Sequence, residues 1–188
     1  MPDATPLFLD TEFTGLHQQA QLISLGLCAE SGAAFYGEVA TVDPAACDPW
    51  VRAHVLPHTR WLSLPAARPQ TLHEGNLTTC FGDGAALAHA LTDWLGQWSR
   101  IEVWADCLAY DWVLFCELFG GARQLPGQVF YMPFDLVTLF KLRGLDPDTD
   151  RVAYAGLAEG SRRHHALWDA RLTLACYRRL LDEPARCP

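Results

Sequence analysis

Apolar residues in the first forty positions gather into runs separated by short polar breaks, a pattern typical of strands. Residues 7–13 (LFLDTEF) form an apolar run interrupted by two acids, and residues 22–29 (LISLGLCA) are almost continuously apolar. A nearly continuous apolar run indicates a strand buried on both faces. The turn sequence at 30–32 (ESG) separates it from a third run at 33–39. The pattern therefore predicts a meander of three antiparallel strands.

The rest of the chain shows helical periods that alternate with shorter strand-like runs. After Asp83, apolar residues recur every three or four positions, which predicts a helix capped by that residue. Residues 58–82 have no clear period and contain two prolines and two glycines, so we expect a loop-rich stretch. The other predicted elements are a short helix between Asp48 and Pro57, strands at 101–105 and 129–132, and helices at 110–119, 134–142 and 165–181.

Strands first, then alternating helices and strands, then a long last helix predict an α/β fold with a mixed central sheet flanked by helices. Half of the 188 residues are apolar, enough for a substantial core, and nothing marks a second domain, so residues 1–188 are predicted to form one domain. No apolar run is long enough to cross a bilayer, and the first residues lack the features of a secretory signal. We therefore expect a cytoplasmic protein that does not associate with membranes.

Charge and cysteine content narrow the function classes. A formal charge of −8 argues against coating long duplex DNA by charge alone, although bound divalent cations would offset part of that charge. The seven cysteines are irregularly spaced and form no C-x-x-C pair. Neither a disulfide framework nor a zinc site is expected.

Two acids interrupt the first predicted strand. Asp10 and Glu12 point to the same face, because side chains alternate along a strand. The apolar residues around them favour a central strand, where a buried carboxylate needs a positive partner. The pair could hold one metal ion or bridge two. The alternative is that one of the acids faces solvent on an edge strand.

Two later segments carry acids suited to the same site. Asp106 and Asp111 follow the strand at 101–105, at the sheet edge where open α/β sheets bind ligands, and either could be a metal ligand. Asp111 also suits a helix start without any metal. Near the end of the chain, His165 and Asp169 lie four residues apart on a predicted helix, hence on one face. They form either a base next to a metal ligand or an ordinary surface pair.

Taken together, these segments resemble the DEDDh exonucleases of the ribonuclease-H-like superfamily. The matching residues are Asp10 and Glu12 on the first strand, Asp111 in the middle, and His165 with Asp169 near the end. Their order and spacing fit over nearly the whole chain. The resemblance implies a ribonuclease-H-like fold and a 3′-5′ exonuclease activity.

Three further segments, 10–13, 22–26 and 50–57, are similar to a narrower branch of these enzymes. That branch contains small bacterial 3′-5′ exoribonucleases related to RNase T and to polyadenylate-specific exoribonucleases, which implies a role in RNA processing. The middle motif departs from the pattern, because many relatives carry His-Asn where this chain has Asp106-Cys107.

The resemblance also implies a mechanism with two Mg²⁺ or Mn²⁺ ions, hard cations that prefer carboxylate oxygens. Two such ions about 4 Å apart activate a water and stabilise the leaving oxygen. Asp10 would bridge both ions, Glu12 and Asp169 would complete the nucleophile side, Asp111 would act near the other ion, and His165 would be the general base.

The resemblance further implies that residues next to the first acids contact the terminal nucleotide: Thr11, Phe13, Thr14 and Leu16. Phe13 either stacks on a base or packs in the core. Arg162 and Arg163 lie near the predicted site and could contact phosphates, whereas cations further along the last helix suit its C-terminal dipole.

The expected substrate is the 3′ end of single-stranded RNA or a short 3′ overhang, cleaved to nucleoside monophosphates. A DNA exonuclease and an enzyme for very short oligonucleotides are alternatives within the same fold. A non-catalytic nucleic-acid-binding module is a third alternative, against which the complete set of acids argues. RNase T-like relatives also suggest a homodimer, in which a partner supplies basic surface.

Overall fold

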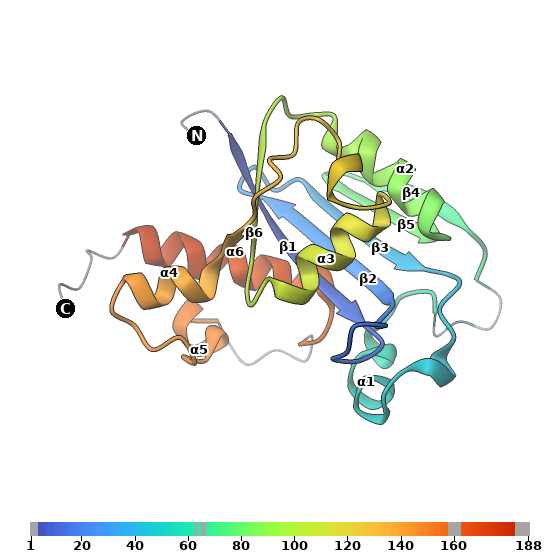
Figure 1. Cartoon of the computed structure of the whole chain (residues 1–188), viewed down its shortest axis with the longest axis horizontal. Coiled ribbons are helices and arrows are strands. Elements are labelled where there is room, and N and C mark those ends of the chain that lie inside the picture. The colour runs from blue at the N-terminus through green and yellow to red at the C-terminus, as the bar shows by residue number, and fades with distance from the viewer. Residues whose placement is uncertain (1–3, 63, 65–66, 158–162, 183–188) are drawn as a thin grey trace.

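The computed structural model describes residues 4–62, 64, 67–157 and 163–182 (Figure 1). Within these residues, the centre of the molecule is a seven-stranded mixed sheet with the strand order β4-β5-β3-β2-β1-β6-β7. The strands are β1 (Thr5–Phe13), β2 (Leu22–Ala29), β3 (Ala34–Val39), β4 (Gln70–Glu74), β5 (Leu77–Gly82), β6 (Ile101–Ala105) and β7 (Phe134–Asp135). The predicted α/β class with a mixed sheet is confirmed.

Strand β1 occupies a central position, as its apolar residues predict. It pairs antiparallel with β2, which pairs antiparallel with β3, so the predicted meander is confirmed. On its other side β1 runs parallel to β6, and the last pair of that ladder is Leu9 with Ala105. Asp10 is therefore the first residue of β1 beyond the end of β6. The edge-strand alternative for the two acids is wrong.

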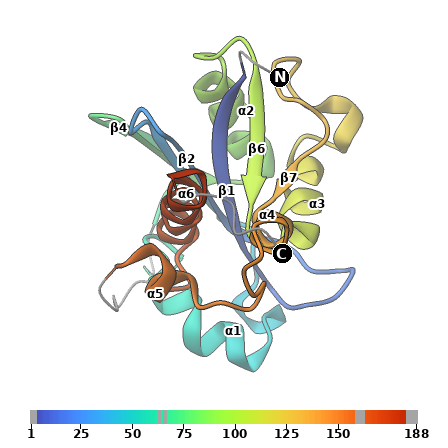
Figure 2. The same cartoon turned by 90° about the vertical axis from the view of Figure 1, so that its left-hand side faces the viewer.

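The α-helices of the described residues are α1 (Pro49–His54), α2 (Gly84–Leu95), α3 (Ala109–Leu118), α4 (Leu136–Leu142), α5 (Arg151–Ala155) and α6 (Ala166–Asp182). Helices α2, α3 and α6 pack against the sheet, and α4 and α5 pack against α6. Figure 2 shows α6 and α3 on opposite sides of β1. Because side chains alternate along β1, the strand contributes to the core on both faces of the sheet. Leu7 and Leu9 pack with α2 and α3, while Phe8 packs with α6. The even-numbered residues of β1, which include Asp10 and Glu12, therefore face α6.

Two predictions of secondary structure are wrong. Residues 58–82 contain a hairpin, β4 and β5, which joins the sheet through parallel pairing of β5 with β3. Most of β4 is exposed, so it lacks the alternation that marks a half-buried strand. The strand predicted at 129–132 is reduced to one bridge between Val129 and Ile101, and β7 instead occupies the start of the predicted helix at 134–142. Asp135 caps α4 by accepting the backbone N–H of Thr138 at 2.8 Å.

The described residues contain neither a membrane-spanning helix nor a disulfide bond. In this part of the chain, no helix combines the length and the apolar character needed to span a bilayer. The six cysteines found there are all free thiols, and five of them are buried. Cys187 and Arg162 lie outside the described residues.

Helix α6 approaches the sheet most closely at Gly26 of β2. A Cβ atom on Gly26 would lie 2.3 Å from both the backbone nitrogen and the Cα of Leu167. Gly26 is also the register partner of Asp10. Because only a hydrogen atom separates β2 from α6 here, the start of α6 is brought directly over the acids of β1.

We expect Gly26→Ala to destabilise the protein by about 2–3 kcal/mol, because the added methyl meets backbone atoms that cannot rotate away. Urea denaturation of the wild type and the variant measures this difference in the free energy of unfolding. Gly127→Ala is the matched control, since a Cβ there meets nothing within 4 Å. Equal urea midpoints for Gly26→Ala and Gly127→Ala would contradict the close approach.

Candidate active site

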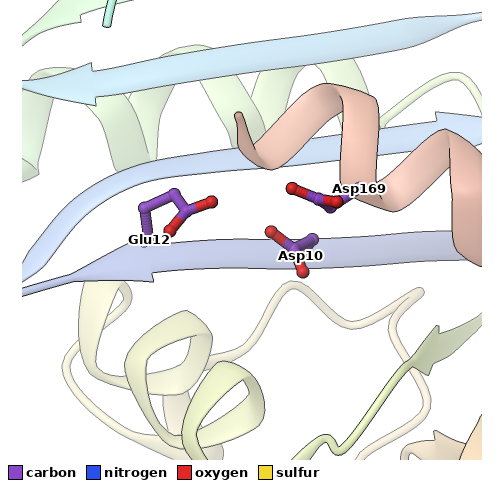
Figure 3. A group of neighbouring side chains, drawn as sticks. All are labelled: Asp10, Glu12 and Asp169. Carbon is purple, nitrogen blue, oxygen red and sulfur yellow. The ribbon is translucent and has the colours of Figure 1, made fainter. Parts of the chain in front are cut away.

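Three acids from two distant segments, β1 and α6, converge where β1 passes the end of β6. Figure 3 shows Asp10 and Glu12 on β1 and Asp169 on α6, with their carboxylates turned toward one another. One oxygen from each of the three lies within 4.8 Å of the others. Carboxylate oxygens grouped in this way match the ligands that hard divalent cations prefer. The structure thus brings together three of the four predicted metal ligands.

Asp111, the fourth predicted ligand, lies on the first turn of α3 and lines the same cavity, which has a volume of about 340 Å³. It is outside the three-acid group. Its Oδ1 accepts hydrogen bonds from the backbone N–H of Thr11 at 2.9 Å and from the Thr11 hydroxyl at 2.6 Å. Thr11 points away from its neighbours Asp10 and Glu12 because side chains alternate along β1. The predicted substrate contact is therefore engaged in holding Asp111.

Asp106 was the competing candidate for the middle acid, and it too lines the cavity. Its carboxylate accepts two hydrogen bonds from the guanidinium of Arg151, at 2.8 Å from Nε and 3.0 Å from Nη2. Arg163, a second lining arginine, lies 3.7 Å from Asp150. Asp106 is therefore neutralised by a cation, whereas within the described residues no arginine or lysine forms an ion pair with Asp111. This difference favours Asp111.

Burial and mutual repulsion raise the pKa of every acid in the cluster. Burial, then the charges of the other acids, raises the pKa of Asp10 well above its usual value. The same causes raise the pKa of Glu12 to about 8. Burial raises the pKa of Asp111 and of Asp169 to about 6, while hydrogen bonds from Thr11 and from the backbone before α6 oppose the rise. Cations that neutralise the cluster would replace these protons, so the acids present fit divalent metal ions.

The two histidines before α6 face different cavities. His164 has a left-handed backbone (φ 67°), lines the acid cavity, and donates its backbone N–H to Asp169 Oδ2 at 2.9 Å. The ring of His165 stacks on Tyr36, with centroids 4.4 Å apart, and lines a second cavity. The structure therefore places His164, and not the predicted His165, beside the acids. The helical spacing did not reveal this because α6 begins at Ala166, after both histidines.

Three of the four residues predicted to contact the nucleotide, Thr11, Phe13 and Leu16, line the acid cavity, and Thr14 does not. Phe13 and the largely exposed Leu16 line both the acid cavity and an adjoining apolar hollow of about 250 Å³. Phe13 also stacks on Tyr110, with centroids 5.4 Å apart. Thr14 is buried, and its hydroxyl accepts a backbone N–H from its own loop at 2.9 Å. Trp50, which the sequence did not single out as a site residue, forms another wall of the hollow.

A mixed sheet with acids from its first strand, a middle helix and the last helix is the arrangement expected of a ribonuclease-H-like 3′-5′ exonuclease. The chain belongs to the family of Rv2179c-like 3′-5′ exoribonuclease domains, whose family model matches residues 5–181. The 3′-5′ exoribonuclease Rv2179c of Mycobacterium tuberculosis strain H37Rv is 34% identical over 137 residues, 73% of this chain and 74% of that protein. The 3′-5′ exoribonuclease MT2234.1 of strain CDC 1551 shows the same values. The prediction of an enzyme of the 3′-5′ exonuclease class is confirmed.

We expect the metal-free protein to lose stability as the pH rises from about 5 to about 8. The pKa of Glu12 is about 8 in the folded state, against roughly 4.3 for an unperturbed glutamate. Between these values the folded state binds more protons than the unfolded state, so the free energy of unfolding falls with rising pH. Thermal unfolding in EDTA across this range measures the effect.

Glu12→Gln should raise the Tm in EDTA at the upper end of this range, because it removes one buried negative charge. It should also reduce the Tm increase that Mg²⁺ causes in the wild type. Glu117→Gln, an exposed change on α3, is the matched control. If both variants kept the wild-type response to pH and Mg²⁺, the electrostatic description of the cluster would be wrong.

Proposed function

We propose that this protein is a divalent-metal-dependent 3′-5′ exoribonuclease that shortens single-stranded RNA or short 3′ overhangs and releases nucleoside monophosphates. The observation that carries the proposal is the cluster of Asp10, Glu12 and Asp169, with oxygens within 4.8 Å of one another. Membership of the Rv2179c-like family of 3′-5′ exoribonuclease domains and similarity to mycobacterial 3′-5′ exoribonucleases support RNA as the substrate. A cytoplasmic location, a homodimer and a single exonuclease domain stay predictions.

Asp10, Glu12 and Asp169 would hold one Mg²⁺ or Mn²⁺ ion, and Asp10 would extend to a second ion on the side of Asp111. When bound, the ions supply an activated water and stabilise the oxygen that leaves phosphorus. The chain supplies the fixed oxygens. Thr11 acts as a positioning residue, because both of its hydrogen bonds go to Oδ1 of Asp111 and fix the orientation of that carboxylate.

His164 replaces His165 as the proposed general base. It lines the acid cavity, and its backbone is tied to Asp169. Burial lowers the pKa of His164, and the nearby positive charges of Arg163, His54 and His58 lower it further. A neutral imidazole at neutral pH can accept a proton from the attacking water. Stacking on Tyr36 directs the ring of His165 into the other cavity.

The apolar hollow beside the acids is the proposed place for the terminal base. Phe13, Leu16 and Trp50 line it, and Glu12 connects it to the acid cavity. An aromatic wall suits the flat face of any base, and stacking of this kind contributes about 1–3 kcal/mol for each base. Because stacking does not read base edges, we propose that the hollow accepts different terminal nucleotides.

Shortening of a 5′-labelled RNA with Mg²⁺ and with Mn²⁺ tests the proposal, with a matched DNA strand as a second substrate. Asp10→Asn should abolish metal-dependent shortening while the Tm in EDTA is kept or raised. The proposal fails if the wild-type protein does not shorten the RNA with Mg²⁺ or with Mn²⁺. Shortening of the DNA strand alone would instead identify a DNA exonuclease.

His164→Asn and His165→Asn form a matched pair that tests the base. Asparagine tolerates the left-handed backbone of His164, so this substitution should keep the local backbone conformation. Removing a general base lowers kcat by about 10²–10⁴-fold, and we expect this loss in His164→Asn only. A larger loss in His165→Asn would return the assignment to His165.

A further inference from the structure

A second cavity, of about 450 Å³, lies on the opposite flank of α6 from the acids. The first turns of α6 form the wall that the two cavities share. His164 and Asp169 line the acid cavity, while their neighbours His165 and Trp168 line the second one. Consecutive Cα atoms are about 3.8 Å apart, so the two cavities adjoin at the start of this helix.

The charged lining of the second cavity is entirely cationic, in a chain whose formal charge is −8. Its basic residues are His58, Arg60, His165 and Arg171, and none of its lining residues is acidic. Arg171 is exposed, and no ion pair within the described residues involves it. Arg60 lies over the ring of Trp61, 4.7 Å from its centroid, and its one acidic partner within the described residues is Glu74 at 3.8 Å, with both side chains of this ion pair exposed. Exposed pairs of this kind are weak, so an anion in the cavity could compete for Arg60.

A buried hydroxyl adds a polar group to the same cavity. Thr79 on β5 is 1% exposed, and its Oγ1 has no hydrogen-bond partner within the described residues. Thr79 is the register partner of Tyr36, whose ring stacks on His165, so both side chains face α6. A buried hydroxyl without a partner is costly to the fold, and a bound oxygen would satisfy it.

The wall that carries Arg60 is held in place from behind. Glu38 is fully buried and accepts backbone N–H groups from Arg60, from Trp61 at 2.9 Å and from Leu62 at 2.9 Å. The hydroxyl of Tyr36 donates to the same carboxylate at 2.8 Å. Because its oxygens are directed to this loop, Glu38 does not line the cavity. The cavity is therefore shaped before any ligand arrives.

We propose, on the basis of the proposed function, that this cavity binds a backbone phosphate of the RNA strand upstream of the nucleotide held at the acids. Two guanidinium groups and a hydroxyl supply the donors that a phosphate accepts. His54 and His58 lie close enough to His164 to lower its pKa, so basic side chains extend from the acid cavity toward the second one. A phosphate contact fixes the position of the strand and reads no base, so the site acts on affinity and substrate length.

Arg171→Ala tests the site, with Arg178→Ala as the matched control. Arg178 lies on the same helix seven residues further on, where it pairs with Glu30 at 3.2 Å, so both variants lose one positive charge. The ratio of kcat/KM for an RNA decamer to that for a dinucleotide should fall about tenfold in Arg171→Ala, the loss of one charged hydrogen bond. The ratio should keep its wild-type value in Arg178→Ala. Most of the loss should be in KM.

The salt dependence of binding supplies a second readout. With the labelled decamer and Asp10→Asn protein, the slope of log K against log salt concentration should become shallower by about 0.7 when Arg171 is replaced. Equal slopes and equal kcat/KM ratios in the two arginine variants would overturn the site, while RNA shortening by the wild type would leave the proposed function standing. Absence of shortening by the wild type would refute the proposed function itself.

A free phosphate is the other source of the same chemistry. In one outcome, inorganic phosphate inhibits dinucleotide cleavage by the wild type but not by Arg171→Ala, while both proteins keep the same ratio of kcat/KM for the decamer to that for the dinucleotide. That result would identify the cavity as a product site and overturn the proposal. Thr79→Val separates binding from folding. It should raise the Tm, because a buried unsatisfied hydroxyl is lost, and weaken decamer binding about tenfold. Unchanged decamer binding in Thr79→Val would contradict the role of the hydroxyl.

Discussion

The surrounding structure must withstand the repulsion among four carboxylates, those of Asp10, Glu12, Asp111 and Asp169. Burial and neighbouring charge raise the pKa of each acid, so the folded chain keeps together groups that would separate in a flexible one. Each acid is restrained differently: two by the ladder between β1 and β2, Asp111 by Thr11, and Asp169 by the backbone before α6. The sheet and its helices thus supply the rigidity that this charge requires.

Part of the acid cluster could be predicted from local periods, because strand alternation alone sets Asp10 and Glu12 on one face. The selection of Asp111 over Asp106, and of Asp169, depended instead on the resemblance to the DEDDh exonucleases. The histidine could not be predicted in this way. Its identity depends on one backbone angle, the left-handed φ of His164, which directs two adjacent rings into two cavities.

Secondary structure could likewise be predicted where it depends on a local sequence period, but not where it depends on contacts between distant segments. The buried meander and the long amphipathic helices carry strong periods, and they were predicted. The hairpin of β4 and β5 has only a weak hydrophobic period. Strand β4 is an exposed edge strand, and β5 depends on pairing with β3, which lies far away in the sequence. The ion pair between Arg151 and Asp106, 45 residues apart, likewise leaves no local pattern.

The contact between Gly26 and α6 has a consequence for any metal ion that the acids would hold. The separation between Asp10 and Asp169 is set there by main-chain atoms of β2 and α6, with no side chain between them. Side chains can change rotamer when a neighbour changes size, but main-chain atoms packed in this way cannot. The spacing is therefore fixed by the main chain, and the proposed cations, whatever their radius, would have to be accommodated by rotation of the carboxylates alone.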